Sequence, residues 1–179
     1  MNVLLVLAFA LIFPLVHIFN GWVFKFAEIT PNIALIYLPA FLRLANILIL
    51  GPLRGTLATL LGGMLLMQYF GQDFLSMFLD SACSATGPLL AWYLFRWHSG
   101  RHVELTAIKD LTLLTLLYAV ANAFLHHAVW SLADPSRLKA PEQLMWMVLG
   151  DILGALLGAY ILRWCVLRYR QYKFEKDLL

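Results

Sequence analysis

The sequence predicts an all-α protein whose helices form a bundle within a membrane, and three observations support this fold class. Hydrophobic residues make up 62% of the 179 residues and charged residues only 13%, whereas soluble domains are about half apolar and a quarter charged. Several apolar runs approach or exceed the ~20 residues that a helix needs to cross about 30 Å of hydrocarbon. None of these runs alternates like a strand of a membrane β-barrel, so only helices would satisfy the backbone in lipid.

Uninterrupted apolar stretches predict about six transmembrane helices, at residues 3–24, 32–50, 54–71, 74–97, 108–131 and 142–165. The first stretch lacks the basic start and the small-residue cleavage site of a secretory signal, so we expect a retained helix. Gly51 and Pro52 end the second stretch and turn the chain into the third. Short polar loops join the later helices. We therefore expect a six-helix transmembrane domain over 1–165 and a basic cytoplasmic tail over 166–179.

The distribution of basic residues predicts the orientation. With six crossings and the tail inside, nine basic residues lie on the inner side: Arg54, Arg96, Arg101, Lys109, Arg163, Arg168, Arg170, Lys173 and Lys176. Three lie on the outer side: Lys25, Arg137 and Lys139. The positive-inside rule then places both termini in the cytoplasm. Tryptophans fall near both predicted surfaces, as in an aromatic belt: Trp22, Trp130 and Trp146 outside, and Trp97 and Trp164 inside.

Polar residues inside the predicted spans indicate a candidate site. A lone charge near the midplane costs at least ~2.5–3.5 kcal/mol, so Arg43, Asp80 and Asp151 should face the bundle interior and pair. One arginine cannot neutralise two carboxylates, and the remaining one would be hydrated, protonated or held by a histidine. We expect a polar cavity open toward the outer side, formed by Arg43, Asp80, Asn122, His126, His127 and Asp151. The alternative is that these residues only fix the register of the helices.

Three glycines recur every four residues in "MVLGDILGALLGAYILRW" (147–164). Gly150, Gly154 and Gly158 therefore lie on one stripe of the last helix, where a neighbouring backbone can approach closely. Asp151 lies beside this stripe. We expect the stripe to serve helix packing and to hold Asp151 in place.

The motifs of enzymes, metal sites and nucleic-acid-binding proteins are not found in the sequence. It has no nucleophile elbow, no HExxH and no phosphate-binding glycine loop. The hydroxyl-rich "DSACSATG" (80–87) is compatible with an intramembrane protease, but small hydroxyl residues are common in membrane helix packing. Adjacent histidines such as His126 and His127 point about 100° apart and do not have a chelating spacing. We therefore predict no enzyme, no cofactor and no metal.

The order of four motifs indicates a family. These are the segment "YLPAFLRLANILILGPLRGTLATLLGGML", the span "FLSMFLDSACSATGPLLAWYLFRW", the loop and helix "HVELTAIKDLTLLTLLYAVANAFL", and the closing "WMVLGDILGALLGAYIL". Together they resemble the bacterial membrane-associated sensor domain family (MASE type one), over about 130 residues. The closing Trp-x-x-Gly-Asp-x-x-Gly pattern places the family's acidic position on Asp151. The resemblance implies a multi-pass protein of the bacterial inner membrane, here a stand-alone form without the family's cytoplasmic effector domain.

These observations predict a sensor-like membrane protein with a polar pocket that faces the periplasm. Besides the lipid bilayer, the expected partners are a separate membrane or cytoplasmic protein and a small-molecule ligand, with no role for nucleic acid. Two alternatives stay open at this point. One is a small substrate-binding subunit of a membrane transporter, and the other is an accessory or assembly subunit of a membrane complex.

Overall fold

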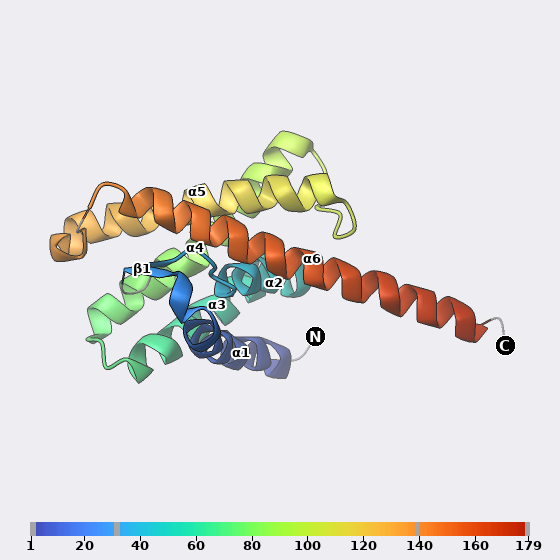
Figure 1. The fold of residues 1–179 in the computed structure, drawn as a ribbon, viewed down its shortest axis with the longest axis horizontal. Helices are drawn as coiled ribbons and strands as arrows, with labels where there is room; N and C mark the ends of the chain where they lie inside the picture. Colours follow the sequence, from blue (N-terminus) through green and yellow to red (C-terminus); the bar gives the residue numbers. More distant parts are fainter. Residues whose placement is uncertain (1–2, 31–32, 139, 178–179) are drawn as a thin grey trace.

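The computed structural model describes residues 3–30, 33–138 and 140–177, and this part of the chain is almost entirely helical (Figure 1). It contains six α-helices, which confirms the predicted all-α class. In order they are α1 (Val3–Val23), α2 (Pro39–Leu50), α3 (Pro52–Tyr69), α4 (Phe74–Ser99), α5 (Ile108–Ala133) and α6 (Gln143–Asp177). The short elements are η1 (Lys25–Ala27), β1 (Glu28–Thr30), β2 (Ile33–Ala34) and η2 (Pro135–Arg137).

Four of these helices are long and apolar enough to cross a membrane, namely α1, α4, α5 and α6. Helix α2 has 12 residues, which at 1.5 Å per residue is about 18 Å and falls short of the ~30 Å hydrocarbon layer. Helix α3 follows it directly after Gly51, which has a positive φ of 84° that favours glycine. Length and composition therefore support four spans within the described part of the chain.

The prediction of a helix across 32–50 was wrong for residues 33–38, which form β2 and a turn before α2 begins at Pro39. Neighbouring helices satisfy the backbone of this non-helical stretch. The Asn20 side chain of α1 donates to the carbonyl of Ile36 at 3.1 Å and accepts from the amide of Leu38 at 2.8 Å. The amide of Tyr37 donates to the carbonyl of Gly150 in α6 at 3.3 Å. Such a stretch is stable at membrane depth only where protein groups replace the missing helical bonds.

Successive helices reverse direction, so the end of α1 with the β1–β2 hairpin, the connection at 70–73 and η2 after α5 lie at one end of the bundle, which we call the hairpin end (Figure 1). The β1–β2 hairpin is antiparallel, with Glu28 opposite Ala34. Helix α6 continues without a break through 35 residues, or about 52 Å, and projects beyond the bundle at the other end (Figure 1). The predicted tail is therefore the continuation of α6 as far as Asp177.

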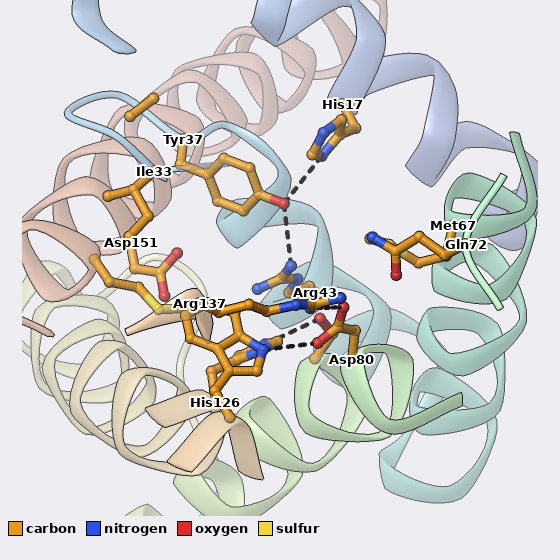
Figure 2. A pocket seen from close by; sticks show the side chains of 14 residues that line it. His17, Ile33, Tyr37, Arg43, Met67, Gln72, Asp80, His126, Arg137 and Asp151 are labelled. Atoms are coloured by element: carbon orange, nitrogen blue, oxygen red, sulfur yellow. Dashed lines mark hydrogen bonds and ion pairs between the residues drawn. The ribbon is translucent and has the colours of Figure 1, made fainter. Parts of the chain in front are cut away.

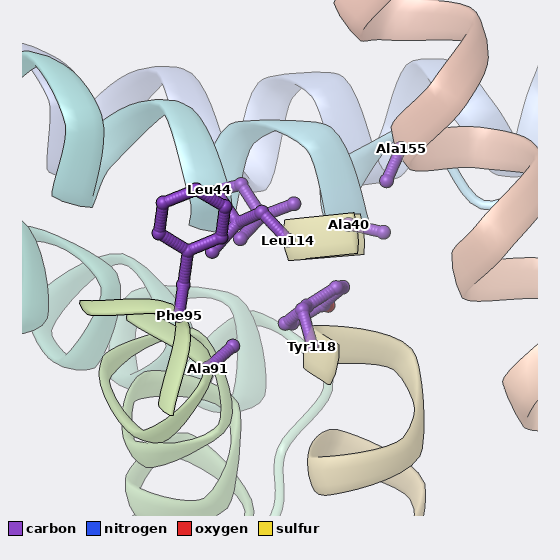
Figure 3. Packing of buried hydrophobic residues seen from close by; sticks show 7 residues of the cluster. All are labelled: Ala40, Leu44, Ala91, Phe95, Leu114, Tyr118 and Ala155. Carbon is purple, nitrogen blue, oxygen red and sulfur yellow. The ribbon is translucent and has the colours of Figure 1, made fainter. Parts of the chain in front are cut away.

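A buried apolar cluster joins four helices below the hairpin end (Figure 3). Tyr118 of α5 and Phe95 of α4 are its largest members, and both are at most 1% exposed. The others are small or branched: Ala40, Leu44, Ala91, Leu114 and Ala155. This cluster fixes α2 between α4, α5 and α6, and thereby fixes the position of Arg43 on the second turn of α2.

The glycine stripe of α6 packs as predicted. A Cβ atom on Gly150 would collide with the carbonyl oxygen of Ala34, and a Cβ on Gly154 with that of Tyr37. A Cβ on Gly158 would collide with the ring of Phe41. The partner of the stripe is therefore the non-helical segment and the start of α2, and this close contact holds the α6 backbone beside Tyr37.

Candidate functional site

A polar cavity lies inside the bundle near the hairpin end (Figure 2). Its volume is about 80 Å³. The elements around it include α1, β2, α2, α4, α5, η2 and α6, so segments far apart in the sequence form one site. Among the described residues, four charged side chains line it: Arg43, Asp80, Arg137 and Asp151. Three of these are the charged residues that the sequence placed inside the membrane.

Arg43 is held by neutral groups. Its side chain is buried, and its two terminal nitrogens donate to the phenol oxygens of Tyr118 and Tyr37, each at 3.1 Å. The guanidinium also lies 5.1 Å from the ring centre of Tyr37 and 5.5 Å from that of Phe13, within the range of cation–π attraction. Its Nε atom is buried and has no hydrogen-bond partner.

The predicted pairing of Arg43 with the two aspartates was therefore wrong. Within the described ranges, no carboxylate forms an ion pair with it. Two phenols hold the guanidinium in place by hydrogen bonds without neutralising its charge. Tyrosine was counted as an apolar residue in the sequence, and this hid its capacity to accept from a buried cation.

Asp151, which carries the opposite charge, is likewise held by a neutral side chain. Its side chain is 2% exposed and accepts a hydrogen bond of 2.6 Å from the Nδ2 atom of Asn122. No ion pair to Asp151 is found in the part of the chain that the structure describes. Asn122 itself packs against Gly87 of α4, and a Cβ atom added to Gly87 would lie only 3.0 Å from the Cβ of Asn122. The amide of Asn122 thus positions the carboxylate without pairing with it as a cation would, and the charge of Arg43 acts on it only through space.

Asp80 finds its partner outside the predicted spans. Its carboxylate forms an ion pair of 2.6 Å with Arg137 of η2 and accepts from the indole Nε1 of Trp130 at 2.9 Å (Figure 2). Arg137 also contacts Asp134 at 3.1 Å. Burial lowers the pKa of Arg137, but the hydrogen bond and the charge of Asp80 outweigh this and raise it. Trp130, which we expect near the outer membrane surface, also forms part of the cavity wall.

The two histidines separate as the helical geometry predicts. His126 is buried and lines the cavity, with Nε2 3.3 Å from the hydroxyl of Ser84 and Nδ1 without a partner. His127 does not line the cavity, and its Nδ1 lies 3.0 Å from the carbonyl of Ala123 on its own helix. Because His126 Nδ1 has no acidic group to orient it, the pair with Ser84 lacks the third member of a nucleophilic triad.

A second, wider hollow of about 350 Å³ adjoins the cavity at the hairpin end. The two share Ile33, Ala34, His17 and Tyr37, and His17 Nδ1 lies 3.0 Å from the Tyr37 hydroxyl at this boundary. We call the second hollow the vestibule. His17 completes a chain of contacts from the vestibule through Tyr37 to the guanidinium of α2 (Figure 2).

Several residues of the site were not predicted from the sequence. Tyr37, Tyr118 and Trp130 occur in apolar runs, and Arg137 occurs in a connection for which no local pattern predicts inward folding. One available signal was that an arginine at midplane depth needs acceptors, and tyrosines are the nearest polar residues on apolar spans. Arg137 had no local signal, because its partner Asp80 lies 57 residues away.

The cavity is suited to binding. It combines charged side chains held in place with buried hydrogen-bonding atoms that have no partner, as in small-molecule sites. In the described ranges, no three residues of His, Cys, Asp and Glu come close enough to hold a metal ion. Comparison of the chain with protein-family models, curated proteins and solved structures finds no match. The residues themselves therefore carry the functional argument.

Proposed function

We propose that this chain is an integral membrane, sensor-like protein that binds a small polar ligand in the cavity and acts through a separate protein partner. The main support is the set of unsatisfied atoms at the cavity: Arg43 Nε, His126 Nδ1 and Gln72 Oε1 are buried without a hydrogen-bond partner. Each buried unsatisfied group costs about 1–3 kcal/mol. A polar ligand that bonds to them recovers that free energy.

The proposal includes an orientation in the bacterial inner membrane. The hairpin end, with the cavity and vestibule, faces the periplasm, and both termini face the cytoplasm. The sequence predicts nine basic residues on the cytoplasmic side and three on the periplasmic side, and this excess supports the arrangement. In this orientation the ligand enters from the periplasm through the vestibule.

Helix α6 provides a route from the ligand to the partner. It carries Asp151 at the cavity and continues to Asp177 without a break. Arg168 and Arg170 are exposed on the projecting part. A shift of α6 against the segment at Tyr37 would therefore move a basic surface on the cytoplasmic side, where a partner protein or anionic lipid binds. This arrangement fits the resemblance to sensor domains that transmit signals to cytoplasmic effectors.

The test combines binding with partner capture. The full chain would be tagged, cross-linked in native membranes and purified in mild detergent. We expect a specific protein to co-purify with the wild-type chain and to be lost from the Arg168→Gln/Arg170→Gln variant, since that variant removes the exposed basic surface. A matched Tyr172→Phe variant, changed at an exposed neutral position on the same helix, should retain it.

Two results would contradict the proposal. One is a chain that captures no protein and shows no change in thermal unfolding when an extract of polar metabolites is added. The other is a double variant, Arg43→Leu/Asp151→Leu, that keeps the partner and the cellular response intact. The second result would favour an accessory subunit whose cavity residues only hold the helices together.

A further inference from the structure

We infer that the ligand of the cavity is a small zwitterion with one carboxylate and one ammonium group, of the size of glycine or alanine. The inference rests on the proposed ligand-binding function and adds the chemical class of the ligand. It follows from two charges of opposite sign that line one cavity and form no ion pair among the described residues, Arg43 and Asp151.

The charge balance of the cavity supports a zwitterion. Asp80 and Arg137 neutralise each other at 2.6 Å. Arg43 and Asp151 balance each other in sign but are held by phenols and an amide, and the described residues show no ion pair between them. A simple anion would add a net negative charge to this balanced set, and a simple amine would add a net positive charge. A molecule with both charges compensates both residues and keeps the membrane-embedded site neutral.

The free atoms suit these two groups. The Nε of Arg43 is the unused donor of a planar fork that binds carboxylates well. The hydroxyl of Tyr37 lies on the same guanidinium and lines the cavity, so it adds a polar group beside an incoming carboxylate. On the opposite side, Asp151 accepts only from Asn122 among the hydrogen bonds of the described residues. A carboxylate has about four lone-pair positions, so Asp151 can accept further bonds from an ammonium group.

The size of the cavity limits the ligand. A volume of 80 Å³ corresponds to about five water molecules, at ~15 Å³ each. The cavity itself therefore fits a compact molecule of on the order of five or six non-hydrogen atoms, and a nucleotide or sugar would extend into the vestibule. Glycine and alanine have this size.

The vestibule adds an entrance of mixed charge. Lys25 and Glu28 both line it, so it carries groups of both signs. A strongly basic entrance would favour anions, and a strongly acidic one would favour amines. The mixed entrance instead suits a molecule without net charge. His17 and Tyr37, in contact at the boundary, are the groups that such a molecule meets before Arg43.

The experiment measures binding of defined probes to the full wild-type chain in lipid nanodiscs. Radiolabelled glycine and alanine would be compared with acetate and methylamine, each of which carries only one of the two charges. We expect saturable binding of glycine or alanine, with acetate and methylamine at least tenfold weaker. This comparison needs no variant, so it does not depend on the stability of an altered cavity.

Charge variants then assign the two groups. Arg43→Gln should abolish binding of glycine. Asp151→Asn keeps a side chain of the same shape but removes the negative charge, so it should weaken glycine at least tenfold and bind acetate more tightly than the wild type does. Glu104→Gln, changed at an exposed carboxylate in the connection between α4 and α5 and outside the cavity lining, is the control and should bind like the wild type.

The outcomes separate the inference from the proposed function. If acetate or methylamine binds better than glycine, or if Asp151→Asn leaves the preference unchanged, the zwitterion is excluded and the cavity remains a ligand site. If none of the four probes binds but a metabolite extract raises the unfolding temperature in an Arg43-dependent way, the zwitterion is likewise excluded. If neither the probes nor the extract has an effect, both the inference and the proposed function are overturned.

Discussion

The cavity contains two arrangements of charge that differ in one respect. On one side Asp80 and Arg137 pair directly at 2.6 Å, and the indole of Trp130 supports the carboxylate. Across the cavity Arg43 and Asp151 form no ion pair and are held by neutral side chains instead. The first arrangement is complete without a ligand, and the second is not.

The difference shows how a membrane protein can fix a charge without neutralising it. The pair at Arg137 ties α4 to the connection between α5 and α6, where the arginine side chain is 27% exposed. Arg43 is a buried residue, and the phenols around its guanidinium fix the position and orientation of that group. A binding site needs such preorganised groups with free capacity. A structural contact needs only the pair.

The largest effect is expected from Gly154→Ala. This change would push α6, which carries Asp151, away from the segment at Tyr37, which contacts Arg43. The new Cβ would overlap the backbone of Tyr37, which cannot move aside as a flexible side chain would. We expect a loss of about 3 kcal/mol or more, at or above the usual range for overpacking. Thermal unfolding in detergent measures it through maleimide labelling of buried Cys83 in a Cys165→Ser background.

Gly21→Ala is the matched control for this prediction. Gly21 also lies in a helix, but nothing lies within 4 Å of a Cβ added there. Alanine should therefore leave stability unchanged or raise it by up to about 1 kcal/mol. Equal unfolding temperatures for Gly154→Ala and Gly21→Ala would contradict the close contact between α6 and the segment at Tyr37.

The next largest effect is expected from Asp80→Ala, which breaks the complete arrangement. It leaves the Trp130 indole without an acceptor and Arg137 with only Asp134. Breaking a fully buried pair costs 3–5 kcal/mol. Because Arg137 is partly exposed, we expect about 2–3 kcal/mol in the same unfolding assay. The double variant Asp80→Ala/Arg137→Ala should lose less than the sum of the single variants, and strict additivity would show that the two side chains do not interact.

A smaller effect is expected from Tyr118→Phe, which acts on the incomplete arrangement. The change removes one acceptor from the Arg43 guanidinium and keeps the ring in the apolar cluster. We expect a loss of about 1–2 kcal/mol, the cost of an unsatisfied buried donor. Tyr93→Phe removes a hydroxyl from an exposed ring and should change nothing. A Tyr118→Phe variant as stable as Tyr93→Phe would mean that other groups satisfy Arg43.

The sequence predicted the helices well and the contacts between charges poorly. Five of the six expected spans begin within two residues of a helix, because apolar length and the Gly and Pro breaks are local signals. The exception is the predicted span 32–50, which was wrong at residues 33–38, since a buried strand or turn is as apolar as a helix. The packing of Gly150, Gly154 and Gly158 was also predictable, because residues spaced four apart lie on one face of a helix.

The partners of the charged residues could not be predicted in the same way. Depth along a helix indicated that Arg43, Asp80 and Asp151 face the interior, and all three line the cavity. Depth does not give rotation about the helix axis or the path of a connection. Arg137 reaches Asp80 because η2 folds back over the hairpin end, and the pairing depends on this tertiary arrangement.

The smallest effect is expected from Asp134→Asn. Comparing it with Asp80→Ala shows how much each of the two carboxylates that contact Arg137 contributes. The hydroxyl of Ser136, followed by the charge of Arg137, holds the pKa of Asp134 below its usual range. A lowered pKa means that Asp134 adds stability above about pH 3.9, the value in an unfolded chain, and loses it as the pH falls through the lower folded value. The effect of Asp134→Asn should therefore be constant between pH 5 and 8. It should also be smaller than that of Tyr118→Phe, because solvent screens an exposed pair. A loss of stability as large as that of Asp80→Ala would mean that Asp134 also holds Arg137 over the cavity. Asp80 and Arg137 would then not form a complete pair by themselves, and their difference from Arg43 and Asp151 would be contradicted.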